Sequence, residues 1–220
     1  EIQVIRSPLG KAIFQNTTRK SDNPKRVTFF GRLEELKGFI AFVNILPQLL
    51  KDNPDILVNF VGTDPELPDG TKSSEYPYDK LSTQDKERVI IHKHLERSAA
   101  IETIAQSSIL LIPSMWENYP YACLEAMALG CCIVGTKNTG IAEMIEDKVS
   151  GTLIDPYNKD EFLKTINSLL RDEQNRLILG ENAKKRAREI AGSSNLIEEN
   201  AELYRKVYTS WKSSYKKPYF

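Results

Sequence analysis

Six short apolar runs, separated by stretches with helical periodicity, constrain the fold more than any other feature of this sequence. The runs span residues 27–30, 56–61, 89–91, 109–113, 132–134 and 151–154. Most of them show little alternation of apolar and polar residues, which is typical of parallel strands covered by helices on both faces. The runs therefore predict the buried strands of an α/β protein.

Helical patterns fill the intervals between these runs. We expect helices at about residues 97–106, 121–129, 141–146, 159–171, 173–191 and 196–213. A further helix follows Gly38, where apolar residues recur on one helical face at Phe39, Phe42, Val43, Leu46 and Leu50. Because an interior proline removes a hydrogen bond, Pro47 predicts a kink in this helix or its division into two shorter pieces.

The alternation of strands and helices predicts both a fold class and a domain organisation. It is typical of a Rossmann-like, doubly wound parallel sheet of about six strands with helices on both faces. We interpret residues 1–26 as an incoming strand and linker, residues 27–192 as the sheet domain, and residues 193–220 as a helix and tail. Residues 62–80 form the longest predicted loop. Ligands of such sheets bind beyond the C-terminal ends of the strands, so the loops there form the candidate site.

Composition and motifs exclude several functional classes. The 220-residue chain has 30 Lys and Arg against 30 Asp and Glu, so it has no overall positive field that would attract a nucleic acid. Its glycines do not form the Gly-x-Gly-x-x-Gly motif of dinucleotide enzymes. His92 and His94 have no carboxylate or thiol cluster beside them, so we expect no metal site. No apolar run approaches the roughly 20 residues that a membrane span requires.

The cysteines and the first residues suggest a compartment. Cys123, Cys131 and Cys132 are odd in number and lack the spacing of a disulfide framework, which favours a reducing, cytoplasmic location. No signal peptide precedes Ile2, and the chain starts at Glu1 rather than Met. We interpret this start as a sign of a fragment.

The first candidate site follows residues 27–30. Arg32 and Lys37 come after Gly31 at the start of a predicted helix, where two cations are unfavourable unless an anion lies between them. A diphosphate would satisfy both cations and the backbone N–H groups of the helix. Alternatively, Glu34 and Glu35 pair with the two cations on a solvated turn.

The second candidate site follows residues 109–113. Glu117 and Glu125 lie eight positions apart, so their side chains converge only if Glu117 lies outside the helix that holds Glu125. Pro120 suits the first turn of that helix, which places Glu117 and Asn118 in the preceding loop. The alternative is a pair of surface glutamates.

These segments together resemble the retaining glycosyltransferases of the GT-B fold, specifically their family four, the group 1 glycosyl transferases. The resemblance rests on Gly-Arg and Lys-Gly in residues 31–38, on Glu-Asn-x-Pro-x-x-x-Leu-Glu-Ala-Met-Ala in residues 117–128, and on Gly-Ile-Ala-Glu in residues 140–143. It extends from about residue 27 to residue 155. It implies that the chain is the donor-binding half of a GT-B enzyme whose N-terminal acceptor domain is missing.

The resemblance also implies roles for single residues. Arg32 and Lys37 would hold the diphosphate of a UDP-, GDP- or ADP-sugar, Glu117 would lie at the transferred hexose, and Glu125 would bind the ribose hydroxyls. Arg32, Lys37 and Glu117 are therefore the catalytic candidates. The other donor-binding positions would be Gly31, Gly62, His92, Asn118, Tyr119 and Pro120. No cofactor or metal is implied, and we expect the fragment alone to be inactive. The alternative is a degenerate module that binds a nucleotide or sugar without catalysis.

Two positions depart from the family pattern. His92-Lys93-His94 stands where the family has a glycine near the nucleobase, so we expect a base contact with an altered edge. Thr139-Gly140 replaces a glycine pair, which we expect to reshape the turn near the donor.

The last predicted helix has an apolar and aromatic stripe. Its members are Ile197, Ala201, Tyr204, Tyr208 and Trp211. The stripe packs either on the core of this domain or, as the resemblance implies, on the missing N-terminal half. We interpret Lys212, Lys216 and Lys217 as a solvated tail, and weak peripheral membrane contact of the longer enzyme is the alternative.

Overall fold

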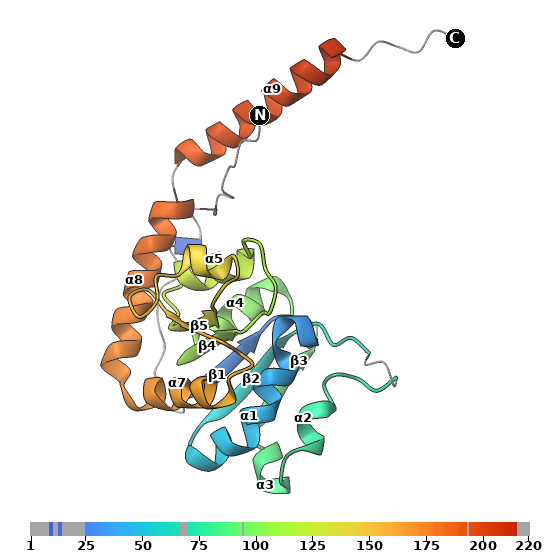
Figure 1. Cartoon of the computed structure of the whole chain (residues 1–220), viewed down its shortest axis with the longest axis vertical. Helices are drawn as coiled ribbons and strands as arrows, with labels where there is room; N and C mark the ends of the chain where they lie inside the picture. The colour runs from blue at the N-terminus through green and yellow to red at the C-terminus, as the bar shows by residue number, and fades with distance from the viewer. Residues whose placement is uncertain are drawn as a thin grey trace.

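A six-stranded parallel sheet forms the centre of the molecule (Figure 1). The computed structural model describes residues 9–10, 13–14, 25–66, 70–93, 95–192 and 194–214. The strands are β1 (Arg26–Phe30), β2 (Leu57–Gly62), β3 (Val89–Lys93), β4 (Ile109–Ile112), β5 (Ile133–Thr136) and β6 (Thr152–Ile154). Their order is β3-β2-β1-β4-β5-β6, and every neighbouring pair is parallel. The predicted doubly wound sheet is thus confirmed, and its order reverses between β1 and β4, where such sheets bind ligands.

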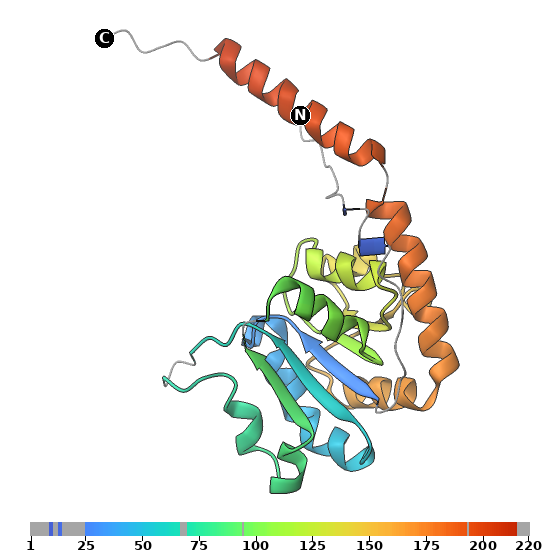
Figure 2. The same cartoon turned by 180° about the vertical axis from the view of Figure 1, so that it is seen from behind.

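Helices cover both faces of this sheet (Figures 1 and 2). The longer ones are α1 (Phe39–Asp52), α4 (Arg97–Ala105), α5 (Tyr121–Ala128), α7 (Lys159–Arg171), α8 (Glu173–Ala191) and α9 (Ser194–Ser214). The short ones are the 3-10 turn η2 (Glu35–Lys37), α2 (Tyr76–Asp79), α3 (Thr83–Lys86) and α6 (Ile141–Met144). The predicted helices at 159–171 and 173–191 have the same bounds in the structure.

The two faces of the sheet pack into two apolar clusters. On one face, five rings from β1, β2, α1 and α7 each have their centroid within 6.3 Å of at least one other: Phe29, Phe39, Phe42, Phe60 and Phe162. The other face packs against α4, α5, α6 and α8. Cys132 is buried in the first cluster and Cys131 in the second, so these neighbours lie on opposite faces of the sheet. Burial of this apolar surface on both sides holds the sheet in place.

Helix α1 continues without a break through Pro47. Of the two outcomes predicted at Pro47, a kink or a division into two pieces, the division is wrong. Apolar residues on both sides of the proline are buried in the same cluster, among them Phe42, Val43, Leu49 and Leu50. Burying each such side chain contributes about 1.5–3 kcal/mol, and together they outweigh the roughly 3 kcal/mol that an interior proline costs.

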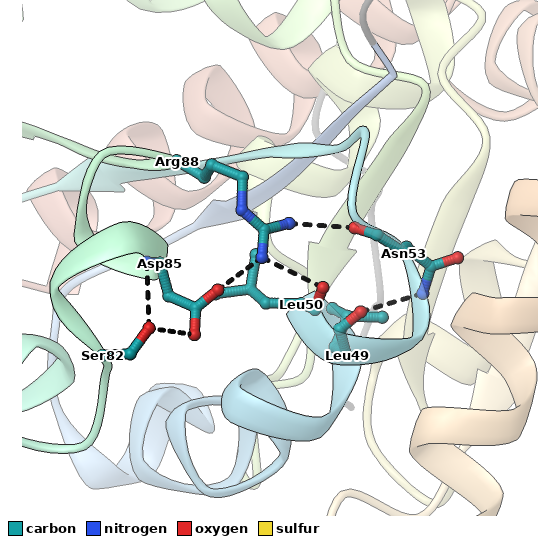
Figure 3. Close-up of polar contacts among 6 residues, drawn as sticks. All are labelled: Leu49, Leu50, Asn53, Ser82, Asp85 and Arg88. Atoms are coloured by element: carbon teal, nitrogen blue, oxygen red, sulfur yellow. Dashed lines mark hydrogen bonds and ion pairs between the residues drawn. The ribbon is translucent and has the colours of Figure 1, made fainter.

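The predicted loop at residues 62–80 holds a helix that the sequence pattern did not indicate, and a second short helix follows it. These are α2 and α3. Ser82 begins α3 because its side-chain oxygen accepts a hydrogen bond from the backbone N–H of Asp85 at 3.2 Å. Figure 3 shows how Arg88, just after α3, then reaches the end of α1. It donates to the carbonyls of Asn53 (2.9 Å) and Leu50 (3.0 Å) and pairs with Asp85.

Few of residues 1–26 are described, and the predicted incoming strand lies outside the described residues. Leu9 and Ile13 are buried in the second cluster, and the N–H of Leu9 donates to the carbonyl of Ala191 at 2.9 Å. These contacts place this part of the chain against the end of α8.

Candidate functional site

The loops after β1 and β4 meet at the C-terminal edge of the sheet, because these strands are neighbours. The N–H of Met115 donates to the carbonyl of Leu36 at 2.9 Å, which ties the two loops together. Gly38 makes this approach possible: a Cβ there would lie 2.1 Å from the carbonyl oxygen of Pro113, and its φ of 75° is in the left-handed region. The place where the sheet order reverses is therefore closed by a tight backbone contact.

Lys37 and Glu117 form an ion pair between these two loops. The Lys37 ammonium donates to Oε1 of Glu117 at 2.6 Å, and the two side chains are 21% and 17% exposed. Arg32, whose side chain is 59% exposed, instead pairs with Glu34 at 2.8 Å. The alternative that glutamates of the same turn pair with both cations is thus right for Arg32 and wrong for Lys37.

A cavity of about 420 Å³ lies at this ion pair. Six of the predicted site residues line it: Arg32, Lys37, Glu117, Asn118, Tyr119 and Pro120. Trp116 and Tyr121 also line it, and both side chains are exposed. The cavity thus combines two cations, the carboxylates of Glu34 and Glu117, the N-terminus of α5 and two accessible aromatic rings. This set of groups suits an anion joined to a ring or hydroxyl-rich moiety.

The loop before α5 lies as the sequence predicts, with one difference. Glu117 and Asn118 lie outside the helix, but Pro120 is the N-cap residue and the first helical residue is Tyr121. Glu125 is therefore one turn into α5. Its carboxylate pairs with Arg97 at the start of α4, and it is not among the residues that line the cavity. No pattern in the sequence indicated Arg97 as its partner.

The turn before α6 supports this loop from behind. The N–H of Gly140 donates to the carbonyl of Glu117 at 2.9 Å. A Cβ on Gly140 would lie 1.2 Å from the carbonyl oxygen of Asn118. Gly140, the first residue of the Gly-Ile-Ala-Glu segment, therefore holds the Glu117 backbone in place. The sequence pattern did not predict this role.

Gly31, Gly62 and His92 lie on the β2 and β3 side of the same edge and do not line the cavity. A Cβ on Gly62 would lie 1.8 Å from the carbonyl oxygen of Gly31, so Gly62 lets the loop after β1 pass close to β2. His92 Nε2 lies 3.0 Å from Oδ1 of Asn59, and burial lowers the pKa of His92. His94 lies outside the described residues.

Asp64 organises the loop that follows β2. Its carboxylate accepts hydrogen bonds from the N–H of Ser74 (2.8 Å) and the Ser74 hydroxyl (2.7 Å), and Lys93 lies 3.3 Å away. Burial opposes its ionisation, but the contacts with Ser74 and Lys93 hold the pKa of Asp64 below its ordinary value. Asp64 and Ser74 are thus held together beside Lys93, at the edge that carries His92.

Neither a metal-binding cluster nor a membrane-spanning helix occurs in the described residues. They contain no group of three or more His, Cys, Asp or Glu side chains that could hold a metal ion. None of the helices in that part of the chain is long and apolar enough to cross a membrane.

Burial raises the pKa of Cys123 well above the usual thiol range, which keeps this thiol protonated.

Known proteins share both the sequence pattern and the fold. The model of the family "Glycosyl transferases group 1" matches residues 11–186. Spore coat protein SA of Bacillus subtilis is 27% identical over 189 residues, which cover 83% of this chain and 49% of that protein. A D-inositol 3-phosphate glycosyltransferase of Corynebacterium kroppenstedtii is 26% identical over 173 residues, which cover 77% of this chain and 38% of that protein. The chain spans about half the length of the curated relatives it matches.

Solved structures carry the same fold. The C-terminal domain of a group 1 glycosyl transferase (LpcC) from Francisella tularensis superposes with a TM-score of 0.65 at 22% identity, covering 82% of this chain and 92% of that domain. HepE of Anabaena, solved with UDP and glucose, superposes with a TM-score of 0.77 at 22% identity, covering 92% of this chain and 56% of HepE. The sheet order thus matches a GT-B domain, and the matched segment includes both loops of the cavity. The chain belongs to the group 1 glycosyl transferases.

Proposed function

We propose that this chain is the donor-binding half of a retaining glycosyltransferase that transfers a hexose from a nucleoside-diphosphate sugar. The observation that carries the proposal is the Lys37–Glu117 ion pair, which lines a cavity at the point where the sheet order reverses. A cation for the diphosphate and a carboxylate for the sugar are thus already adjacent. We further propose that an acceptor domain outside residues 27–192 completes the active site.

The charges of the cavity suit the two ends of the donor. When the bond between the sugar carbon and the diphosphate breaks, negative charge grows on the diphosphate and positive charge on the sugar. The negative charge on the diphosphate is stabilised by Lys37, Arg32 and the N-terminus of α5. The positive charge on the sugar is stabilised by Glu117. The acceptor oxygen forms its bond on the face from which the diphosphate leaves, and its proton passes to the departing phosphate. Glu117 acts here by charge and position, without a covalent intermediate.

Donor binding also requires ion pairs to open. Lys37 neutralises Glu117 and Arg97 covers the Glu125 carboxylate. A diphosphate draws Lys37 toward its own oxygens, which frees the Glu117 carboxylate for the sugar. Displacement of Arg97 frees Glu125 for ribose hydroxyls, the role that the resemblance implies. Because Arg97 is 75% exposed, its pair with Glu125 is screened and opens at little cost.

Calorimetric titration of the chain with UDP, GDP and ADP tests this proposal. UDP is the first ligand to try, since HepE was solved with it. We expect one diphosphate to bind and Lys37→Ala to weaken it about tenfold or more, the usual size of a lost charged hydrogen bond. Lys51→Ala is the matched control, because Lys51 is an exposed lysine at the far end of α1. Equal affinities of the Lys37→Ala variant and the unaltered chain would contradict the proposal.

A transfer assay with the longer protein that contains this chain distinguishes catalysis from binding alone. Glu117→Gln keeps the shape of the side chain but removes its charge. We expect this variant to bind the nucleotide diphosphate and to lose at least about a hundredfold in transfer rate, as for other lost electrostatic groups. If the unaltered longer protein binds a donor but neither transfers nor hydrolyses it, the module only binds, and the catalytic part of the proposal is wrong.

A further inference from the structure

Exposed apolar side chains lie at several places in the described part of the chain. Those on α9 show that the stripe of this helix does not pack on the core of its own domain, so that alternative is wrong. Three others line the cavity beside the ion pair: Leu36, Trp116 and Tyr121, which are 58%, 70% and 51% exposed. Exposed apolar side chains that cluster in this way are typical of binding sites.

The apolar side chains lie at the rim of this cavity, and the ion pair lies deeper. Leu36 and Trp116 directly precede Lys37 and Glu117 in the sequence. The hydrogen bond from the N–H of Met115 to the carbonyl of Leu36 holds the two loops side by side. The Lys37 and Glu117 side chains are mostly buried, whereas Leu36 and Trp116 are mostly exposed. A ligand that enters from solvent therefore meets the apolar side chains first.

The donor proposed above leaves this rim without a ligand. Its diphosphate is bound by the two cations and the N-terminus of α5, and its sugar by the Glu117 carboxylate. For transfer, the acceptor hydroxyl must come within about 3–3.5 Å of the sugar carbon that it attacks. The acceptor must therefore pass over the rim on its way to the donor.

We propose that Leu36, Trp116 and Tyr121, which we call the aromatic rim, hold a sugar ring of a glycan acceptor against the indole of Trp116. A pyranose ring has a face of C–H bonds, which loses water favourably against an indole. Its hydroxyls lie around the edge, where the Arg32–Glu34 pair of the same cavity offers both donors and acceptors. This inference rests on the proposed function, because the acceptor role requires the donor site beside the rim.

The charges of the cavity favour a sugar ring over a lipid chain as the occupant. Arg32, Glu34, Lys37 and Glu117 all line the cavity that carries the aromatic rim. A hydrocarbon chain would remove water from these groups without replacing its hydrogen bonds, which is unfavourable. Sugar hydroxyls replace them. A molecule with one apolar face and a polar edge therefore fits both parts of the cavity.

Saturation-transfer NMR of the chain with methyl and butyl glycosides of glucose, galactose and mannose tests the proposal. We expect the ring C–H protons of at least one of these sugars to receive saturation from the protein. Glycerol, which has hydroxyls but no ring face, should receive none. Saturation of the butyl chain instead of the ring would indicate a lipid acceptor and would overturn the proposal, as would a lack of saturation in every sugar.

Variants of the two exposed tryptophans locate the contact. Trp116→Ser should weaken the ring signals at least about fivefold, because it removes the whole contact area of the indole. Trp116→Phe should retain most of the signal, since it keeps an aromatic face. Trp211→Ser is the matched control, because Trp211 is an exposed tryptophan on α9. Ring signals that persist in Trp116→Ser, or that vanish equally in Trp116→Phe, would contradict stacking on this side chain.

Titration of the Trp116→Ser variant with UDP distinguishes an acceptor contact from a donor contact. We expect this variant to bind UDP as the unaltered chain does. A loss of UDP affinity as large as that of Lys37→Ala would assign Trp116 to the donor and overturn the inference. Absence of diphosphate binding to the unaltered chain would contradict the proposed function, whereas absent sugar signals with intact diphosphate binding would contradict this inference alone.

Discussion

Gly140 holds the Glu117 loop through a contact that no larger residue allows. Its N–H bonds to the Glu117 carbonyl, and a Cβ at this position would lie 1.2 Å from the Asn118 oxygen. One of the two backbones must therefore move if a side chain is added. The position of the Glu117 carboxylate depends on this contact, although Gly140 itself does not line the cavity.

Gly140→Ala is expected to cost about 3 kcal/mol of folding free energy or more, since the overlap involves backbone and not a flexible side chain. Urea denaturation measures this change. Gly10→Ala is the control, because a Cβ there meets nothing within 4 Å. A loss below about 1 kcal/mol for Gly140→Ala would show that the two loops do not touch as described.

Asp64 makes stability depend on pH. Its folded pKa is lowered, so it stabilises the folded state above its unfolded pKa of about 4, and this contribution is lost as the pH falls through the folded value. We expect Asp64→Asn to reduce the free energy of unfolding near pH 7 and to have little effect below about pH 3. Asp79→Asn, at an exposed position, should leave the pH profile unchanged. Parallel profiles for Asp64→Asn and the unaltered chain would contradict this assignment.

The sequence predicted which residues lie at the C-terminal edge of the sheet, but not which of their side chains contact one another. Because Lys37 and Glu117 follow strands that turned out to be neighbours, their shared edge could be predicted. Their ion pair, between residues 80 positions apart, could not be predicted, because Glu34 and Glu35 are acidic residues much closer to Lys37 in the sequence. Arg97 and Asp64 were missed for the same reason: each makes a contact that only the folded chain brings about.

Arg88 links the end of α1 to the short helix α3. It donates to the last turn of α1 and to the residue after it, and it pairs with Asp85 in α3 (Figure 3). Carbonyls at a helix end lack partners within the helix, so these bonds add to those that Asn53 donates to the Leu49 carbonyl. The four-residue helix α3 in turn depends on Ser82 and Arg88.

Arg88→Ala should therefore lower the free energy of unfolding by about 1–3 kcal/mol, the usual effect of leaving charged or buried hydrogen-bonding groups without partners. Thermal and urea denaturation measure this. Lys86→Ala, at a neighbouring exposed position, should change stability by less than about 0.5 kcal/mol. If both variants unfold alike, Arg88 does not support the end of α1.

The elements that were predicted correctly have strong local patterns, whereas those that were missed do not. The strands are apolar runs, of which β4 and β5 are buried at every position, and α7 and α8 are long helices whose bounds matched. Helices α2 and α3 have four residues each, too few to show periodicity. Pro47 does not divide α1, because burial of the residues on both sides of it outweighs its low helix propensity.

The described residues form one sheet domain with a cavity at the C-terminal edge of the sheet and an exposed last helix. The relatives it matches are about twice as long, and transfer in our account requires an acceptor domain as well. We expect the chain alone to bind a nucleoside diphosphate and to transfer no sugar. A transferase assay with the chain and with the longer protein checks this. Transfer by the chain alone, lost on Glu117→Gln, would show that no second domain is needed.

Backbone amide NMR during titration with UDP, GDP or ADP shows where on the chain the nucleotide binds. We predict that saturating diphosphate shifts the signals of residues 31–37, residues 115–121 and Gly140, and leaves those of α3 and the distal half of α7 in place. Saturable shifts that cluster away from the loops after β1 and β4 would contradict the account, as would the absence of shifts with all three diphosphates at millimolar concentration.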